Sequence, residues 1–69
     1  MITDLQRKMI FKAKRHLEDM HKENHKYKVY PQDIVAELNR TNNSLYSYDE
    51  YQGVHCTIKE VKEALLWDY

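Results

Sequence analysis

Four histidines and one cysteine are the side chains of this sequence best suited to metal binding or catalysis. His21 and His25 stand four positions apart on a predicted helix, a spacing that lets two imidazoles share a metal ion. His55 and Cys56 are adjacent, like a base and its thiol, but neighbours in an extended segment point to opposite sides. We therefore predict that Cys56 packs as a small apolar residue and that the chain has no catalytic residue, metal or cofactor.

Lysine and arginine form a second chemical feature, a basic stripe along the first third of the chain. At about 100° per residue, an apolar arc lies on one side of a helix and the cations lie opposite. The cations are Lys8, Lys12, Arg15, Lys22 and Lys26, with Arg7 and Lys14 at one edge. Phe11 lies among them. A basic face of this kind suits the phosphate backbone of nucleic acid.

Charge is unevenly distributed along the chain although the formal net charge is zero. Residues 1–28 contain eight basic and four acidic side chains, a net charge of +4, and residues 29–69 carry a net charge of −4. This asymmetry indicates a basic arm for an acidic partner, or two halves that complement each other within a fold or a homodimer. A solvated helix face beside an acidic body is an equally simple interpretation.

The basic stripe requires a long helix, which we expect over residues 3–24. Thr3 and Gln6 have the spacing of a capping box, and Asp4 suits the helix dipole. The buried side would be an apolar arc, formed by Ile2, Leu5, Met9, Ile10, Ala13, Leu17 and Met20.

A second helix is predicted over residues 31–40. Pro31 suits the first position of a helix, because its missing N–H would have no partner there, and Val29 can pack on Ile34 as a hydrophobic staple. The residue before a proline avoids the α region, so residues 27–30 should be a short extended segment or an edge strand. The polar run 39–43 should end the helix.

A third helix is predicted over residues 57–67. Thr57 and Glu60 have the spacing of a capping box, and Cys56 can pack on Val61 as a staple. Trp67 should fold back onto the first helix, because a tryptophan left in water forgoes a large burial free energy. Residues 44–55 are ambiguous: they form either a short helix that Gly53 terminates or a hairpin that extends to residue 56.

Residues 31–39, Pro-Gln-Asp-Ile-Val-Ala-Glu-Leu-Asn, resemble the first helix of a helix-turn-helix unit, and the resemblance extends over residues 31–67. The second helix is either 44–51, after a tight turn, or 57–67, where Val-Lys-Glu-Ala-Leu is similar to the third helix of winged-helix domains. The resemblance implies double-stranded DNA as the partner. It implies groove contacts from Arg40, Asn42, Asn43, Ser44 and Tyr46, beside the basic face.

The alternative function is binding of a protein partner by an inhibitor or adaptor. Tyrosine and acidic side chains cluster in one segment, and aromatic anchors of this kind form binding hot spots. The segment contains Tyr46, Tyr48, Asp49, Glu50 and Tyr51. Tyrosines that simply fill a thin core would give the same pattern.

Size and composition predict one compact all-α domain of three to four helices. At 69 residues, the chain buries only about 60% of its unfolded surface. A single cysteine allows no internal disulfide, and the sequence lacks a membrane-spanning apolar run and a signal-peptide block, so we expect a cytoplasmic protein. The expected core is Leu5, Met9, Ala13, Leu17, Ile34, Leu38, Ile58, Val61, Leu65 and Trp67.

Overall fold

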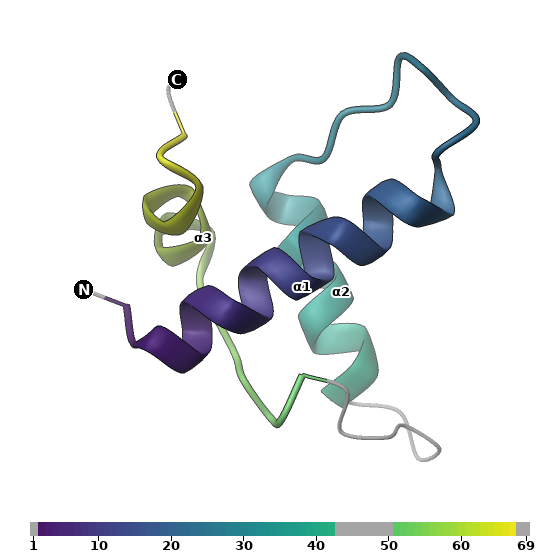
Figure 1. Ribbon diagram of the computed structural model, residues 1–69. Coiled ribbons are helices and arrows are strands. Elements are labelled where there is room, and N and C mark those ends of the chain that lie inside the picture. The colour runs from purple at the N-terminus through teal and green to yellow at the C-terminus, as the bar shows by residue number, and fades with distance from the viewer. Residues whose placement is uncertain (1, 43–50, 68–69) are drawn as a thin grey trace.

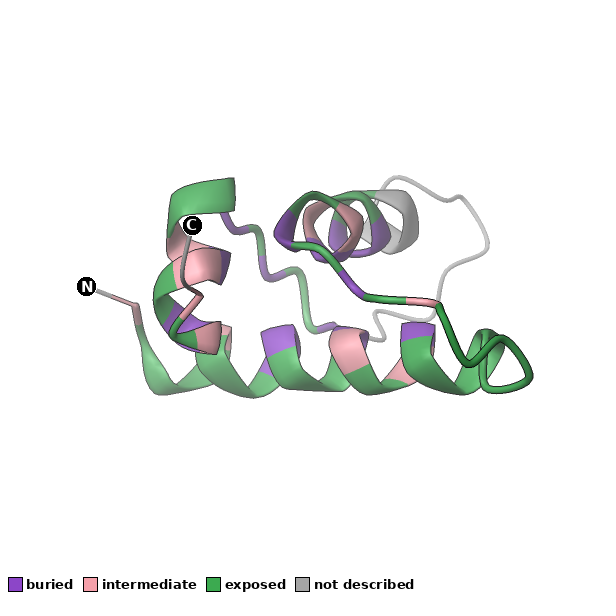
Figure 2. Ribbon diagram, turned by 90° about the horizontal axis from the view of Figure 1, so that it is seen from above, coloured by how far each residue is buried: buried purple, intermediate pink, exposed green. Residues whose placement is uncertain are grey.

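A computed structural model shows an all-α fold with three helices in the part of the chain that it describes. The structure describes residues 2–42 and 51–67, with backbone alone for residues 40–42. The helices are α1 (Asp4–Met20), α2 (Pro31–Asn42) and α3 (Ile58–Leu65). α2 and α3 lie side by side on one face of α1 (Figures 1 and 2), and the opposite face of α1 is exposed along its length. α1 is therefore the base of the fold, with one covered side and one solvated side.

The start of α1 is fixed by the predicted capping box. The Thr3 hydroxyl accepts from the Gln6 N–H at 3.0 Å, and Gln6 Oε1 accepts from the Thr3 N–H at 2.9 Å. The helix ends at Met20, four residues before the expected end. Beyond it the Asn24 N–H donates to the His21 carbonyl at 2.9 Å, so turns replace the helix where no apolar side chain is available for burial.

α2 begins at Pro31, as predicted, and ends at Asn42, two residues later than expected. Asp33 Oδ2 accepts from the Tyr30 N–H at 3.1 Å, and the Tyr30 carbonyl accepts from the Asp33 N–H at 3.0 Å, which closes the first turn. Asparagine and threonine are only mildly unfavourable inside a helix, so the polar run does not stop α2 at once. The segment 27–30 is irregular, which corrects the alternative of an edge strand.

α3 also begins with its predicted capping box. The Thr57 N–H donates to Glu60 Oε1 at 2.9 Å, and the Glu60 N–H donates to the Thr57 hydroxyl at 3.1 Å. The helix ends at Leu65 rather than at residue 67, because Leu66 adopts the left-handed conformation with φ of 53°. This conformation costs a non-glycine residue about 1 kcal/mol. It directs Trp67 away from the path of the helix.

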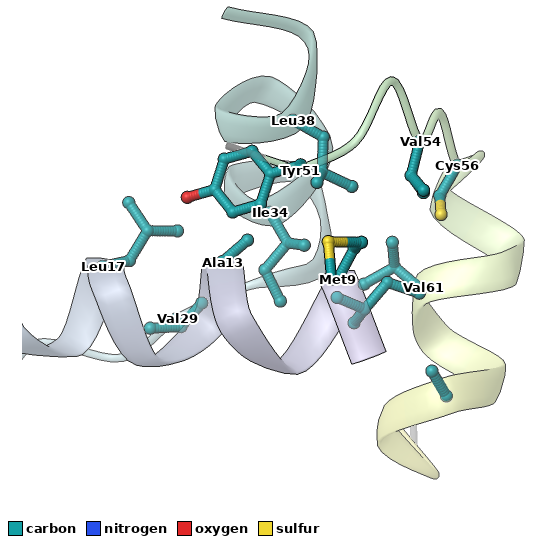
Figure 3. Close-up of a cluster of buried hydrophobic side chains, with 12 residues drawn as sticks. Met9, Ala13, Leu17, Val29, Ile34, Leu38, Tyr51, Val54, Cys56 and Val61 are labelled. Atoms are coloured by element: carbon teal, nitrogen blue, oxygen red, sulfur yellow. The ribbon is translucent and has the colours of Figure 1, made fainter. Parts of the chain in front are cut away.

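Residues 51–56 fill space between the helices without forming a strand. Gln52 and Gly53 have φ of 54° and 72°, so this turn has two left-handed residues, of which only the glycine avoids the steric cost. Val54 and Cys56 are buried (Figure 3). Residues 51–56 thus do not supply a hairpin strand, while the rest of the ambiguous segment, 44–50, lies outside the described residues.

One hydrophobic core lies between the three helices (Figure 3). Its members are Met9, Ile10, Ala13, Leu17, Val29, Ile34, Leu38, Tyr51, Val54, Cys56, Val61 and Ala64. Two expected members, Leu5 and Ile58, are instead 43% and 45% exposed. Leu65 and Trp67 are only partly buried. The eight residues of α3 cover a short stretch of α1, so the edges of both apolar faces remain in solvent.

Candidate nucleic-acid interface

The side of α1 that is turned away from α2 and α3 is exposed (Figure 2), and the basic stripe is exposed on α1. Arg7, Lys8, Lys12 and Arg15 are all exposed. Because Met9, Ile10, Ala13 and Leu17 bury the inner side of the helix, the 3.6-residue period turns these cations outward. The 17 residues of α1 span about 25 Å. The helix therefore presents a long row of positive charge to solvent.

Ion pairing leaves most of this charge uncompensated within residues 2–42 and 51–67. Lys14 Nζ lies 2.9 Å from Glu18 Oε2, one helical turn further on, so Lys14 is neutralised locally. In those same ranges no carboxylate oxygen lies within 4.0 Å of Arg7, Lys8 or Arg15. Asp4 and Asp19 are exposed on α1 and moderate the field at its two ends.

Lys12 differs from the other cations of the stripe, because it lies beside the core. Its Nζ is 6.0 Å from the centroid of the Tyr51 ring, at the outer limit of a cation–π contact. The side chain is nevertheless exposed. Lys12 therefore marks the inner edge of the basic face.

Lys22 and Lys26 extend the positive charge past the end of α1. Both are exposed, in the loop that joins α1 to α2. The His21 ring stacks on the Tyr27 ring at 3.9 Å between centroids, with 19° between their planes, and the Lys26 N–H donates to Asn24 Oδ1 at 3.1 Å. These contacts give the loop a defined course, so both lysines have fixed positions relative to α1.

Phe11 is an aromatic ring inside the basic stripe. It is 45% exposed. Residues three and four positions away are its neighbours on a helix surface, and these are Arg7, Lys8, Lys14 and Arg15. Phe11 thus joins the cationic surface and is absent from the core.

The second part of the predicted DNA contact lies largely outside the described residues. Arg40 and Asn42 occupy the last turn of α2, of which only the backbone is described, and Asn43, Ser44 and Tyr46 follow it. Residues 43–57 separate α2 from α3, whereas the two helices of a helix-turn-helix unit are joined by about three to four residues. The helix-turn-helix arrangement remains a prediction.

Tyr51 corrects the alternative protein-binding segment. It was expected among exposed anchors, with Tyr46, Tyr48, Asp49 and Glu50, but its side chain is completely buried between α1 and α2 (Figure 3). Its hydroxyl donates to Glu37 Oε2 at 2.8 Å. Because burial removes the ring from any free surface, Tyr51 is a core residue. The other four side chains lie outside the described residues.

A polar cluster formed by His16, Glu37 and Tyr51 was missed by the sequence reasoning. Glu37 is only 5% exposed, and its Oε2 lies 3.0 Å from His16 Nδ1 as well as 2.8 Å from the Tyr51 hydroxyl. His16 Nδ1 also lies 3.2 Å from that hydroxyl. The position of Glu37 in the sequence could have revealed this cluster. Glu37 falls on the α2 face that carries Ile34 and Leu38, where its carboxylate is buried and needs hydrogen-bond donors.

The other three histidines and the cysteine lie in different surroundings. His21 stacks on Tyr27, His25 is exposed, and His55 Nδ1 lies 3.4 Å from Asn39 Oδ1. Within the described ranges, no three His, Cys, Asp or Glu side chains are grouped so that they could hold a metal ion. Cys56 is buried, as predicted.

The Cys56 thiol is held in its protonated form. Burial and the nearby Glu60 charge raise its pKa, and the Gln6 side chain opposes this effect. A thiol with a raised pKa is a poor nucleophile at neutral pH. Cys56 therefore contributes packing and a hydrogen bond with Gln6 rather than thiolate chemistry.

Comparison with known proteins gives no relative from which a function could be transferred. No helix in the described parts of the chain is long and apolar enough to cross a membrane. No protein-family model matches the chain, and neither the curated proteins nor the solved structures provide a significant match.

Proposed function

We propose that this chain is a small non-enzymatic regulator that binds double-stranded DNA through the outer face of α1. The main support is that Arg7, Lys8 and Arg15 are exposed on α1, whose side turned away from α2 and α3 is solvated (Figure 2). Lys12 is exposed at the edge of this face, beside Tyr51. A straight helix about 25 Å long can follow several successive phosphates without rearrangement.

Phosphate contacts of this kind provide affinity and orientation but little sequence preference. Base recognition in this proposal comes from the end of α2 and the residues that follow. The side chains concerned are those implied by the helix-turn-helix resemblance, Arg40, Asn42, Asn43, Ser44 and Tyr46, with Lys22 and Lys26 extending the backbone contact. Most DNA readers of this size act as dimers, so the proposal includes a homodimer as the binding species.

The proposal predicts a steep dependence of affinity on salt. Four phosphate contacts release enough counterions to weaken binding about 100-fold between about 50 and 200 mM salt. Fluorescence anisotropy of a labelled mixed-sequence duplex measures this directly. An affinity that changes less than about threefold over that range would argue against phosphate binding.

Charge reversal locates the interface. Lys8→Glu on α1 should weaken duplex binding about tenfold or more at the lower salt, since it removes one phosphate contact and adds a repulsive charge. Lys59→Glu is the matched control, because Lys59 is also an exposed helical lysine but lies on α3. Equal losses in both variants would contradict the assignment to α1. If the unmodified chain binds no duplex even at low salt, a protein partner becomes the better hypothesis.

A further inference from the structure

We propose that Lys28, Tyr30 and Trp67 form a stacking site for an unpaired base of single-stranded DNA. We call these three residues the Trp67 site. The inference rests on the proposed DNA binding and adds to it a second kind of ligand, an unpaired base, beside the phosphates that the cations of α1 would bind.

Two distant parts of the sequence meet at the Trp67 site. Tyr30 immediately precedes α2 and Trp67 follows α3, and both helix ends lie on the same side of the molecule (Figure 1). The ring centroids are 5.7 Å apart with 62° between the ring planes. In an edge-to-face pair, the edge of one ring meets the face of the other, so the pair itself does not use the flat faces of the edge-on ring.

The rings of the site are accessible to a ligand. Tyr30 is 45% exposed and Trp67 is only partly buried. The ring of Trp67 contacts Tyr30 and Lys28, in the segment before α2. A base that stacks on these rings would remove aromatic surface from water, which contributes favourably to the free energy of binding.

The position of Lys28 selects the chemistry of the ligand. Its Nζ lies 5.0 Å from the Trp67 ring centroid and 5.7 Å from that of Tyr30. The ammonium therefore already occupies the cation–π position, and a second cation such as an arginine of a partner protein would be repelled. A nucleotide suits the site better, because its neutral base can stack while its phosphate meets the ammonium.

Hydrogen bonds hold the backbone on both sides of the site. The Tyr30 N–H donates to Asp33 Oδ2 at 3.1 Å, and the Trp67 N–H donates to the Lys62 carbonyl at 3.0 Å. Asp33, whose carboxylate accepts the first of these hydrogen bonds, is the acidic residue closest in sequence to Tyr30. Because the backbone of both ring-bearing residues is held before binding, stacking requires less ordering of the chain.

The consequence is a preference for DNA with unpaired bases. In a duplex each base is already stacked between its neighbours, so the Trp67 site can engage only a single strand or an open end. The protein would then bind duplex phosphates on α1 and a single-stranded segment beside α2 and α3.

The test uses Trp67 as its own reporter, because it is the only tryptophan in the sequence. A labelled short oligothymidylate and a labelled duplex whose two ends are closed by non-nucleotide linkers are titrated with the full chain at low salt. Anisotropy of the label reports binding, and tryptophan emission reports stacking. We expect both DNAs to bind and only oligothymidylate to quench Trp67 strongly.

Variants separate stacking from simple charge. Tyr30→Ala should weaken oligothymidylate binding about tenfold and leave duplex binding unchanged, while Tyr30→Phe, which keeps a ring, should behave as the unmodified chain does. Circular dichroism confirms that each variant is folded.

The outcomes distinguish this inference from the proposed function. Duplex binding without any quenching by oligothymidylate would overturn the stacking site and leave the proposed function standing. Oligothymidylate binding that is equally strong in Tyr30→Ala would overturn the stacking site as well. Absence of binding to both DNAs would overturn both proposals.

Discussion

Among the described residues, a buried polar link and a surface polar link join α1 to its neighbouring helices. The buried link connects His16 on α1 to Glu37 on α2 and to Tyr51. The surface link connects Gln6 on α1 to Glu60 on α3, where Gln6 Nε2 donates to Glu60 Oε2 at 3.1 Å and to the His55 carbonyl at 3.3 Å. Both depend on a glutamate, but the two glutamates differ in their access to water.

This difference determines what each link contributes. Water cannot replace a lost partner of Glu37, because that side chain is 5% exposed, so its hydrogen bonds are obligatory. Glu60 is accessible to water, and its link chiefly sets the position of one helix on the other. Since Gln6 and Glu60 each belong to a capping box, this one hydrogen bond joins the start of α1 to the start of α3.

The largest effect is expected for the buried link. Glu37→Ala leaves the Tyr51 hydroxyl and His16 without their shared acceptor, which should lower the free energy of unfolding by about 2–3 kcal/mol. That is a large share of the total for a chain of this size. Urea denaturation followed by circular dichroism measures the change. Glu23→Ala, an exposed glutamate in the loop, should shift stability by less than about 0.5 kcal/mol, and equal shifts would contradict the comparison.

An intermediate effect is expected for the surface link. Gln6→Ala removes half of the Thr3 capping box and the hydrogen bond to Glu60, which should lower the free energy of unfolding by about 1 kcal/mol. The same urea experiment applies. A matched variant, Gln32→Ala in the first turn of α2, has an exposed glutamine and should be nearly neutral. A loss larger than that of Glu37→Ala would reverse our ranking of the two links.

The smallest effect concerns the pH dependence of the surface link. Hydrogen bonds from the Thr57 backbone and from Gln6 lower the pKa of Glu60 below its usual value of 4.5 in the folded state. Because the pKa of Glu60 is lower in the folded chain than in the unfolded chain, its ionised carboxylate stabilises the fold at pH values above the unfolded pKa. This contribution is lost as the pH falls through the folded pKa. In the variant Glu60→Gln, the melting temperature should therefore decrease less steeply as the pH is lowered below about 4.5. If the melting temperature of Glu60→Gln falls with pH as steeply as that of the unmodified chain, Glu60 contributes nothing to the acid sensitivity of the fold.

Local signals predicted the starts of all three helices. Thr3 with Gln6 and Thr57 with Glu60 form the capping boxes that their spacing indicated, and Pro31 occupies the first position of α2. Such signals act within four residues of the chain, so no knowledge of the tertiary fold is needed to read them. The outward direction of the α1 cations was predicted for the same reason, from helical period alone.

Residues outside the helices could not be assigned in this way. Tyr51 and Val54 are core residues because residues 51–56 lie among the helices, and no sequence period indicates that placement. Tyrosine has an apolar ring and a polar hydroxyl, so its type alone suits both core and surface. Tyr51 became a core residue only because Glu37 and His16 provide partners for its hydroxyl there.

The sequence by itself determined the starts of the three described helices, the buried centre of the apolar stripe of α1 and the exposed cations of that helix, because each depends on neighbours within a few residues. The tertiary structure decided which side chains meet across the helices. It paired Glu37 with His16 and Tyr51, joined the two capping boxes through Gln6 and Glu60, and brought Lys28 and Tyr30 to Trp67. These contacts depend on how α2 and α3 pack on α1, and such packing follows from the shape of the whole core rather than from any one segment.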